Sequence, residues 1–527
     1  MIMKARGLLL FAALFALLPA AARAEWWRAE TGHFIIYSQD DKAATQEFAV
    51  QLERFDNAMR ALQNLPLRPA KPLSPANKVT IFRLGTIRDI ALLAGAPGSG
   101  VAGFYIPRAG AAVAFTPARA EARDIRSINN RESDPRTELD PRSILQHEYV
   151  HHFMLQTFPA TYPDWYVEAF AELYGTIVLN SDGSFKVGSP PQYRAEQVYD
   201  LPDVPLKELF DQNDKRDGVQ RIQFYGYGWL LAHYLSFEPS RKGQLRDYLK
   251  ALGRGEDGLA AARKAFGDLG TLTKEVSAYK TRNFPAFAVK PANYVAPAVE
   301  LRQLNEAEAA AMGEYMRSKR GVNLKQARAV ADDVAPKARR YANSLFVQLA
   351  AAEAFYDARR LDEADAAATR ALALQPNSSE AWLYKGMIAL EQAEAGDKSR
   401  FAAARTALVK ATRLDTQDPR AFILYYESFG AAGEPAPANA VAGLEQVFDF
   451  AASDRDYRLT LARQLLAEGE GPAAKEVLGP IAYRFHGDQK DNMVRTVIDL
   501  IRADKVPEAR TKLDEIFKKA EADAKKD

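Results

Sequence analysis

Cysteine is absent from this chain of 527 residues. Its absence excludes a disulfide framework and lipid attachment through an N-terminal cysteine. Charge of one sign is not in excess, because the formal net charge is +2. Residues 1–24 hold three basic residues and no acidic one, so the remainder carries 2 − 3 = −1. Without a basic surplus, the composition gives no support for binding nucleic acid or an anionic membrane surface.

Long apolar runs are also lacking beyond the N-terminus. Two basic residues precede the apolar run Leu8–Ala22, and Ala22-Arg23-Ala24 has the small-x-small pattern of a signal-peptide cleavage site. We therefore expect an export signal at 1–24, cleavage after Ala24, and a bacterial-type periplasmic or secreted protein. An uncleaved anchor is the alternative. No later segment is long enough for a stable membrane span.

The length and a hydrophobic content of 47% predict a globular chain of more than one domain. Segments rich in β-branched and aromatic residues predict strands in the first half, and helical spacing predicts helices between and after them. Three prolines without a helical pattern predict a linker. The expected division is a signal peptide at 1–24, an α+β domain at 25–282, a linker at 283–299 and an all-helical domain at 300–527.

The most informative short stretch is His147-Glu148-x-x-His151, which falls within a predicted helix from Asp140 to about Phe158. Residues four apart on a helix share a face, so His147 and His151 can bind one metal ion. Glu148 stands beside the first of them, where a carboxylate can accept a proton from zinc-bound water. The pattern predicts one half of a zinc site.

A second predicted helix, beginning at Trp165, carries Glu168 and Glu172 one turn apart. Two histidines and one glutamate are a recognised ligand set for catalytic zinc. Glu168 is the candidate third ligand, and Glu172 is placed to orient a ligand histidine through its other ring nitrogen. The alternative is that both carboxylates face solvent.

Three of the four remaining histidines are predicted to have other roles. His33 has no patterned partner and is expected to be structural or at the surface. His152 lies one position beyond the predicted ligand face, so we expect it to pack or to form a local hydrogen bond. His233 lies on an apolar helix and is expected to be packed.

Together, His147-Glu-x-x-His151 and Trp165-Tyr-Val-Glu168-Ala-Phe-Ala-Glu172 resemble the gluzincins, the thermolysin-like and aminopeptidase-like zinc metallopeptidases. The resemblance covers about residues 26–282. It implies a small mixed sheet with a helical part, Zn²⁺ held by His147, His151 and Glu168, and Glu148 as general base. The match departs from the family pattern at two points. Val167 stands where asparagine is usual. The 16 residues between His151 and Glu168 are slightly fewer than in the best-known members.

The segment from Phe224 to Leu235 resembles the Tyr-x-x-Gly-aromatic helix of the aminopeptidase-like members. By this resemblance the Tyr225 hydroxyl stabilises the oxyanion, and Tyr227 is the rival. Phe104–Ile106 and Ala112–Phe115 are predicted to form a hairpin or two edge strands, where gluzincins pair with an extended peptide. The Gly-x-Met-Glu-Asn motif that captures a free amino terminus is absent, so endopeptidase activity is favoured.

From about residue 300 the chain becomes rich in alanine, leucine and charge. Segments that begin at Leu361, Phe401, Gly471 and Val506 each predict the second helix of a pair, at spacings of about 35 to 40 residues. This pattern resembles degenerate tetratricopeptide repeats, which stack into a solenoid with a concave binding face. An irregular helical bundle is the alternative.

These features favour an exported zinc metallopeptidase that acts on a peptide or protein substrate and binds a protein partner through its repeats. A protein-binding scaffold with an inactive metallopeptidase-like domain is the alternative. A zinc hydrolase of a non-protein amide is a further alternative.

Overall fold

The computed structural model describes residues 25–97, 103–119, 141–211, 218–482 and 493–524. The predicted signal peptide and Asp140 lie outside these residues. Among the helices it does describe, none combines the length and the apolar character needed to cross a membrane.

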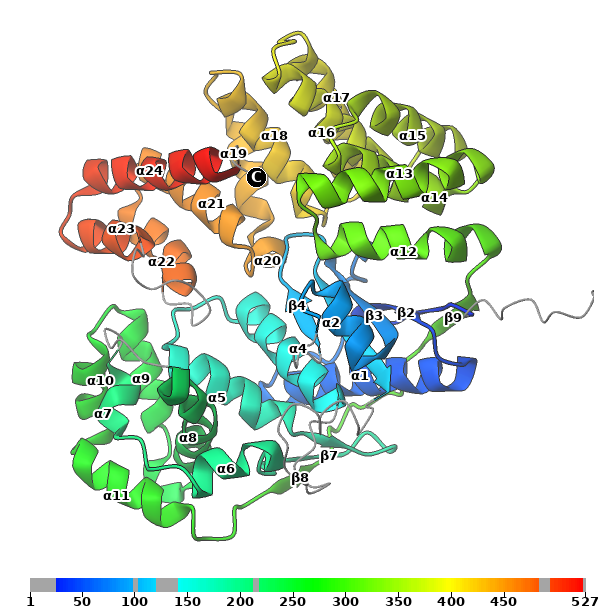
Figure 1. The fold of residues 1–527 in the computed structure, drawn as a ribbon. Helices are drawn as coiled ribbons and strands as arrows, with labels where there is room; N and C mark the ends of the chain where they lie inside the picture. Colours follow the sequence, from blue (N-terminus) through cyan, green and yellow to red (C-terminus); the bar gives the residue numbers. More distant parts are fainter. Residues whose placement is uncertain (1–24, 98–102, 120–140, 212–217, 483–492, 525–527) are drawn as a thin grey trace, which may run out of the picture.

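The described strands form two sheets (Figure 1). A six-stranded mixed sheet has the order β4-β5-β3-β2-β1-β9, and a small antiparallel sheet has the order β6-β7-β8. In the larger sheet β2, β3 and β5 are parallel, whereas the outer pairs are antiparallel. The strands are β1 Trp27–Glu30, β2 Phe34–Ser38, β3 Val79–Thr86, β4 Phe104–Ile106, β5 Val113–Arg119, β6 Val178–Leu179, β7 Phe185–Val187, β8 Phe287–Val289 and β9 Glu300–Gln303.

The large sheet is covered by helices on both faces. Side chains alternate along a strand, so Phe34 and Ile36 pack against α1 (Lys42–Leu62) and α4 (Pro141–Thr157). Ile35 and Tyr37 point to the opposite face, which α2 (Ile87–Leu93) and α12 (Glu306–Arg320) cover. The predicted hairpin at 104–115 is confirmed, with β4 at the edge of the sheet.

A second core follows α4 and is entirely helical. Trp165 of α5 and Trp229 of α8 are its largest fully buried side chains. Helix α5 packs against both α4 and α8 and so joins the sheet to this helical part. The elements are α5 Asp164–Gly175, η3 Gln192–Arg194, α6 Ala195–Tyr199, α7 Leu206–Phe210, α8 Gly218–Phe237, η4 Pro239–Arg241, α9 Gln244–Gly253, α10 Gly258–Phe266 and α11 Leu269–Tyr279, while η1 Pro75–Asn77 precedes β3.

The C-terminal part is a helical repeat region in which successive helices pack against each other. Figure 1 shows it as an arc above the large sheet, from light green to red. The four predicted second helices begin at Leu361, Arg400, Gly471 and Val506, within one residue of the expected positions. The helices are α13 Leu324–Arg340, α14 Leu345–Asp357, α15 Leu361–Leu374, α16 Ser379–Glu394, α17 Arg400–Leu414, α18 Pro419–Ala431, α19 Ala438–Gln446, α20 Phe448–Ala451, α21 Arg455–Ala467, α22 Gly471–Ala482, α23 Met493–Arg502 and α24 Val506–Ala524.

The domain boundary differs from the predicted one. Residues 283–299, expected to be a linker, contain β8, and residues 300–303, expected to open the helical domain, form β9 beside β1. Both strands are short, and three of the four side chains of β9 are exposed. Neither strand therefore has the alternation of apolar residues that identifies a strand in a sequence.

His33 belongs to a buried cluster of charged groups beneath α4. Its Nδ1 lies 2.7 Å from Glu53 Oε1 and 3.3 Å from Asp56 Oδ2, both on α1. Asp56 also accepts hydrogen bonds from Arg60 Nε and the Tyr149 hydroxyl. Burial lowers the pKa of His33, but Asp56 and Glu53 raise it overall. His33 is therefore buried and paired with two carboxylates, so the surface alternative is wrong.

The charged cluster around His33 predicts how the stability of the fold depends on pH. The folded pKa of His33 exceeds its ordinary value of 6.5, so its contribution is complete below pH 6.5 and is lost as pH rises through the raised pKa. We expect the free energy of unfolding to fall across that window, by about 1.4 kcal/mol for each pKa unit of elevation. Denaturant titration should show a flatter profile for His33→Gln. An equal decline in the variant would contradict this role.

Candidate metal centre

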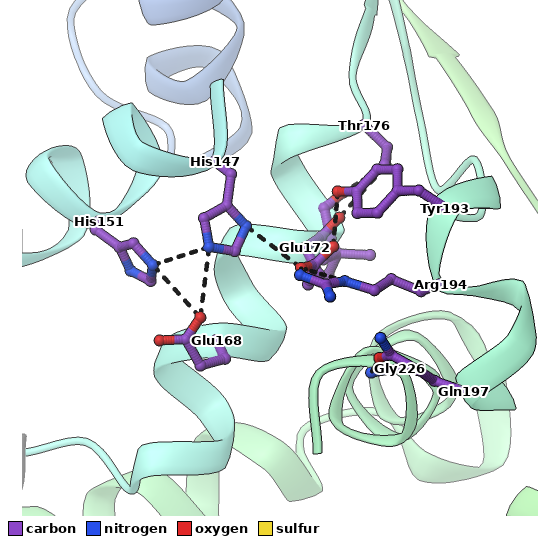
Figure 2. Close-up of polar contacts among 10 residues, drawn as sticks. His147, His151, Glu168, Glu172, Thr176, Tyr193, Arg194, Gln197 and Gly226 are labelled. Atoms are coloured by element: carbon purple, nitrogen blue, oxygen red, sulfur yellow. Dashed lines mark hydrogen bonds and ion pairs between the residues drawn. The ribbon is translucent and has the colours of Figure 1, made fainter. Parts of the chain in front are cut away.

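Helices α4 and α5 bring the three predicted ligands together (Figure 2). His147 Nε2 and His151 Nε2 are 3.1 Å apart, and both point toward Glu168 on α5. Glu168 Oε2 lies 3.4 Å from His147 Nε2 and 3.6 Å from His151 Nε2. Glu168 is 1% exposed, so it does not face solvent.

These separations fit a tetrahedral zinc ion. Ligand atoms at about 2.0–2.1 Å from a tetrahedral centre lie about 3.3–3.4 Å from each other. The three observed separations of 3.1, 3.4 and 3.6 Å bracket that value. Two neutral imidazoles and one carboxylate would leave a net charge of +1 at the ion. The donor types and their spacing therefore suit zinc.

Glu172 lies behind His147, on the side away from the other two candidate ligands. Its Oε1 is 3.5 Å from His147 Nδ1, which is the contact expected of a carboxylate that orients a ligand histidine. Arg194 donates from Nε and Nη2 to Oε1 at 3.0 and 2.7 Å, and the Tyr193 hydroxyl donates to Oε2 at 2.7 Å. Glu172 is fully buried, so these donors fix its position.

Tyr193 and Arg194 were not identified from the sequence. They follow two prolines in a short segment without helical or strand periodicity. Their partner Glu172 is more than 20 residues away, and no spacing rule connects the two positions. The role of Tyr193 and Arg194 follows from the tertiary fold, in which both residues contact Glu172 of α5.

The two candidate oxyanion donors lie in different surroundings. The Arg194 guanidinium lies 4.5 Å above the ring of Tyr225. Burial raises the pKa of Tyr225, and the carboxylates of Glu168, Glu172 and Glu148 raise it further. Tyr227 is fully buried in the helical core, with its hydroxyl 3.3 Å from Ser277 Oγ. Tyr225 thus contacts Arg194, the residue that holds Glu172, whereas Tyr227 contacts Ser277 in the helical core.

Gly228 lies where α8 approaches α5. A Cβ atom at this position would lie 3.3 Å from the Trp165 carbonyl oxygen, closer than an ordinary van der Waals contact. Gly228, which is three residues after Tyr225, therefore lets α8 approach the first turn of α5. The two helices pack closely at this point.

Electrostatics around the first ligand follow from its two acidic neighbours. Burial lowers the pKa of His147, but Glu168 and Glu172 raise it overall. Glu148, one position on, is half-buried and close enough to both His147 and Tyr225 to affect their pKa values. The site therefore concentrates negative charge where a divalent cation would be held.

Two further histidines lie outside the candidate ligand set. His152 Nδ1 lies 2.6 Å from the hydroxyl of Tyr105, which is 47 residues away in sequence, so this hydrogen bond is not the local one that was expected. His233 is packed in the helical core, where its ring nitrogens lie 3.0 Å from the Tyr279 hydroxyl and 3.1 Å from the Gly188 carbonyl. Neither contributes a ligand atom to the His147 cluster.

The contact between Arg194 and Glu172 gives a second prediction. In Arg194→Met, Glu172 loses two hydrogen bonds and can turn away from His147. We expect zinc affinity to fall by about 10- to 100-fold, as is typical when a partner of a ligand histidine is removed. Titration with a competing chelator measures this. Arg194→Lys, which keeps the charge but not the two-pronged contact, should lose less. Unchanged affinity in Arg194→Met would contradict the role given to Glu172.

No family model and no curated protein matches this sequence. Among solved structures, the chain is similar to a thermophilic tetratricopeptide-repeat protein of Thermus thermophilus. The identity is 16% and the TM-score 0.29, over 37% of this chain and 100% of that one. In residues 306–482 and 493–524 successive helices pack against each other, as in a helical repeat region, and the resemblance of the first domain to metallopeptidases stays a prediction.

Proposed function

We propose that this chain is a zinc-dependent hydrolase of peptide bonds, most simply an endopeptidase. The observation that supports the proposal best is the convergence of His147, His151 and Glu168 at separations suited to one tetrahedral ion. Glu148, adjacent in sequence to His147, adds a carboxylate that binding the metal does not require. That residue makes hydrolysis a better explanation of the site than a structural role for the ion.

In this proposal His147, His151 and Glu168 would hold zinc, and the ion would provide a Lewis acid able to lower the pKa of a bound water toward about 7 and to polarise a carbonyl. Glu148 accepts the proton of the attacking water and passes it to the leaving amine. The Tyr225 hydroxyl donates a hydrogen bond to the oxygen on which negative charge develops. Arg194 and Glu172 keep His147 in the orientation that leaves Nε2 available for the ion.

The proposal is tested by incubating the purified chain with an unstructured protein, with and without a zinc chelator. We expect cleavage that stops when zinc is removed and returns when zinc is added back. A chain that holds zinc but cuts no peptide bond would contradict the proposal. A panel of non-protein amides then tests whether the same site acts on another bond.

A protein-binding scaffold is the second candidate function, with the first domain inactive. The extended helical repeat region favours it, because stacked helix pairs present continuous surfaces suited to protein partners. In that case the chain should capture a protein equally well when Glu148 is replaced by glutamine. Under the hydrolase proposal, the repeats serve the same site by binding the substrate or a partner protein.

A further inference from the structure

The turn between β4 and β5 contacts the repeat region through three consecutive residues. Arg108 donates from Nη1 and Nη2 to the carbonyl oxygens of Lys319 and Arg320, at 2.9 and 3.3 Å. Both carbonyls lie at the C-terminal end of α12, where helix carbonyls lack partners within the helix. The charge of the guanidinium also suits the negative end of the helix dipole.

The next two residues contact the starts of two other helices. The backbone N–H of Ala109 donates to Asp454 Oδ2 at 2.9 Å, and the other carboxylate oxygen of Asp454 caps α21. Gly110 has a φ of +67°, and a Cβ there would lie 2.7 Å from Oδ1 of Asp418, the cap of α18. The turn therefore contacts the ends of three helices that are far apart in sequence.

This contact matters because β4 is a short strand at the edge of the large sheet. It has three residues and pairs with β5 alone, so it has backbone hydrogen bonds on one side only. Its second anchor is Tyr105, whose hydroxyl lies 2.6 Å from His152 Nδ1 on α4. His152 is four residues after Glu148, so the two share one face of that helix. Tyr105 thus fixes β4 beside the face of α4 that carries the candidate general base.

We propose that the repeat region positions β4 beside α4, with Arg108 and Tyr105 as positioning residues for the binding of an extended peptide. The part that concerns peptide binding rests on the proposed function, whereas the tethering of β4 does not. Arg108 and Tyr105 are not among the candidate ligands. They fix the position of β4, whose backbone would form hydrogen bonds with an extended peptide. Their loss should therefore affect substrate binding more than bond cleavage.

The test uses the full-length zinc-loaded chain with Arg108→Ala and Tyr105→Phe. Arg340→Ala is the matched control, since Arg340 also lies in the helical region but pairs with exposed Glu306. Hydrogen exchange of the β4 amides, zinc content and the kinetics of cleavage of an unstructured peptide are measured. Protection of the central β2 amides shows that each variant is folded.

We expect β4 amides to exchange about tenfold faster in Arg108→Ala than in the control, and KM to rise about tenfold. Zinc content and kcat should stay within about twofold of wild type. Tyr105→Phe should raise KM similarly, and the double variant should add little, because both residues hold one strand.

Three results would overturn the inference. If β4 exchange in Arg108→Ala equals that of Arg340→Ala, the repeat region does not hold the strand. If exchange rises while KM is unchanged, or if kcat alone falls, the strand does not bind substrate. If wild type cleaves no peptide, the proposed function fails, and the exchange measurement alone still decides whether the repeats tether β4.

Discussion

Replacing Glu148 by glutamine is expected to abolish peptide hydrolysis while leaving zinc in place. Glutamine has nearly the same shape as glutamate but cannot accept the proton of the attacking water. General-base catalysis typically contributes about 10²- to 10⁴-fold, so we expect kcat to fall by at least about 100-fold. Zinc content should be unchanged, because Glu148 is not among the residues that converge as ligands. Steady-state kinetics and metal analysis on the same preparation measure both quantities.

Glu47→Gln is a suitable control, because it makes the same chemical change at an exposed position of α1. It should behave as wild type. If Glu148→Gln retains more than about a tenth of the activity, general-base catalysis by this residue is excluded, since the expected contribution is far larger. If the variant loses its zinc, Glu148 has a structural role in holding the metal.

The second large effect is expected from His151→Ala, which removes one of three ligands. We expect zinc affinity to fall by more than about 100-fold, which is more than the loss typical when only a hydrogen-bond partner of a ligand is removed. Hydrolysis should disappear with the metal. Gln146→Ala is the matched control, since it shortens a side chain on the same helix one position before His147. Competition with a chromophoric chelator gives both affinities.

The two substitutions separate binding from chemistry. Glu148→Gln should hold zinc without activity, whereas His151→Ala should lack both. If His151→Ala binds zinc as tightly as Gln146→Ala, the ion is held elsewhere or by fewer residues. The candidate site would then need a different ligand set.

Much of this site could be predicted because its residues lie on regular elements. His147 and His151 are four apart on a helix, and Glu168 and Glu172 are four apart on the next, so each pair shares a face whatever the rest of the fold. Two helices joined by a short turn can then face each other. In the structure Glu168 and Glu172 both lie within 3.5 Å of a ring nitrogen of His147.

Contacts that depend on the tertiary fold could not be predicted in this way. Arg194 contacts Glu172 from the three-residue 3-10 helix η3, and His33 contacts Glu53, which is 20 residues away in sequence. The strand β9 is exposed and polar because it lies at a sheet edge, so its pattern does not differ from that of a loop. The tether between Arg108 and α12 joins residues more than 200 positions apart. Local periodicity carries no information about such pairs.

The central claim is that His147, His151 and Glu168 hold one zinc ion. It is tested most directly by metal analysis of the purified chain after adventitious metal has been removed and one equivalent of zinc has been returned. We predict one tightly bound zinc per wild-type chain and none in Glu168→Ala at the same chelator concentration. A wild-type chain that retains no zinc, or a Glu168→Ala chain that retains as much, would contradict the claim.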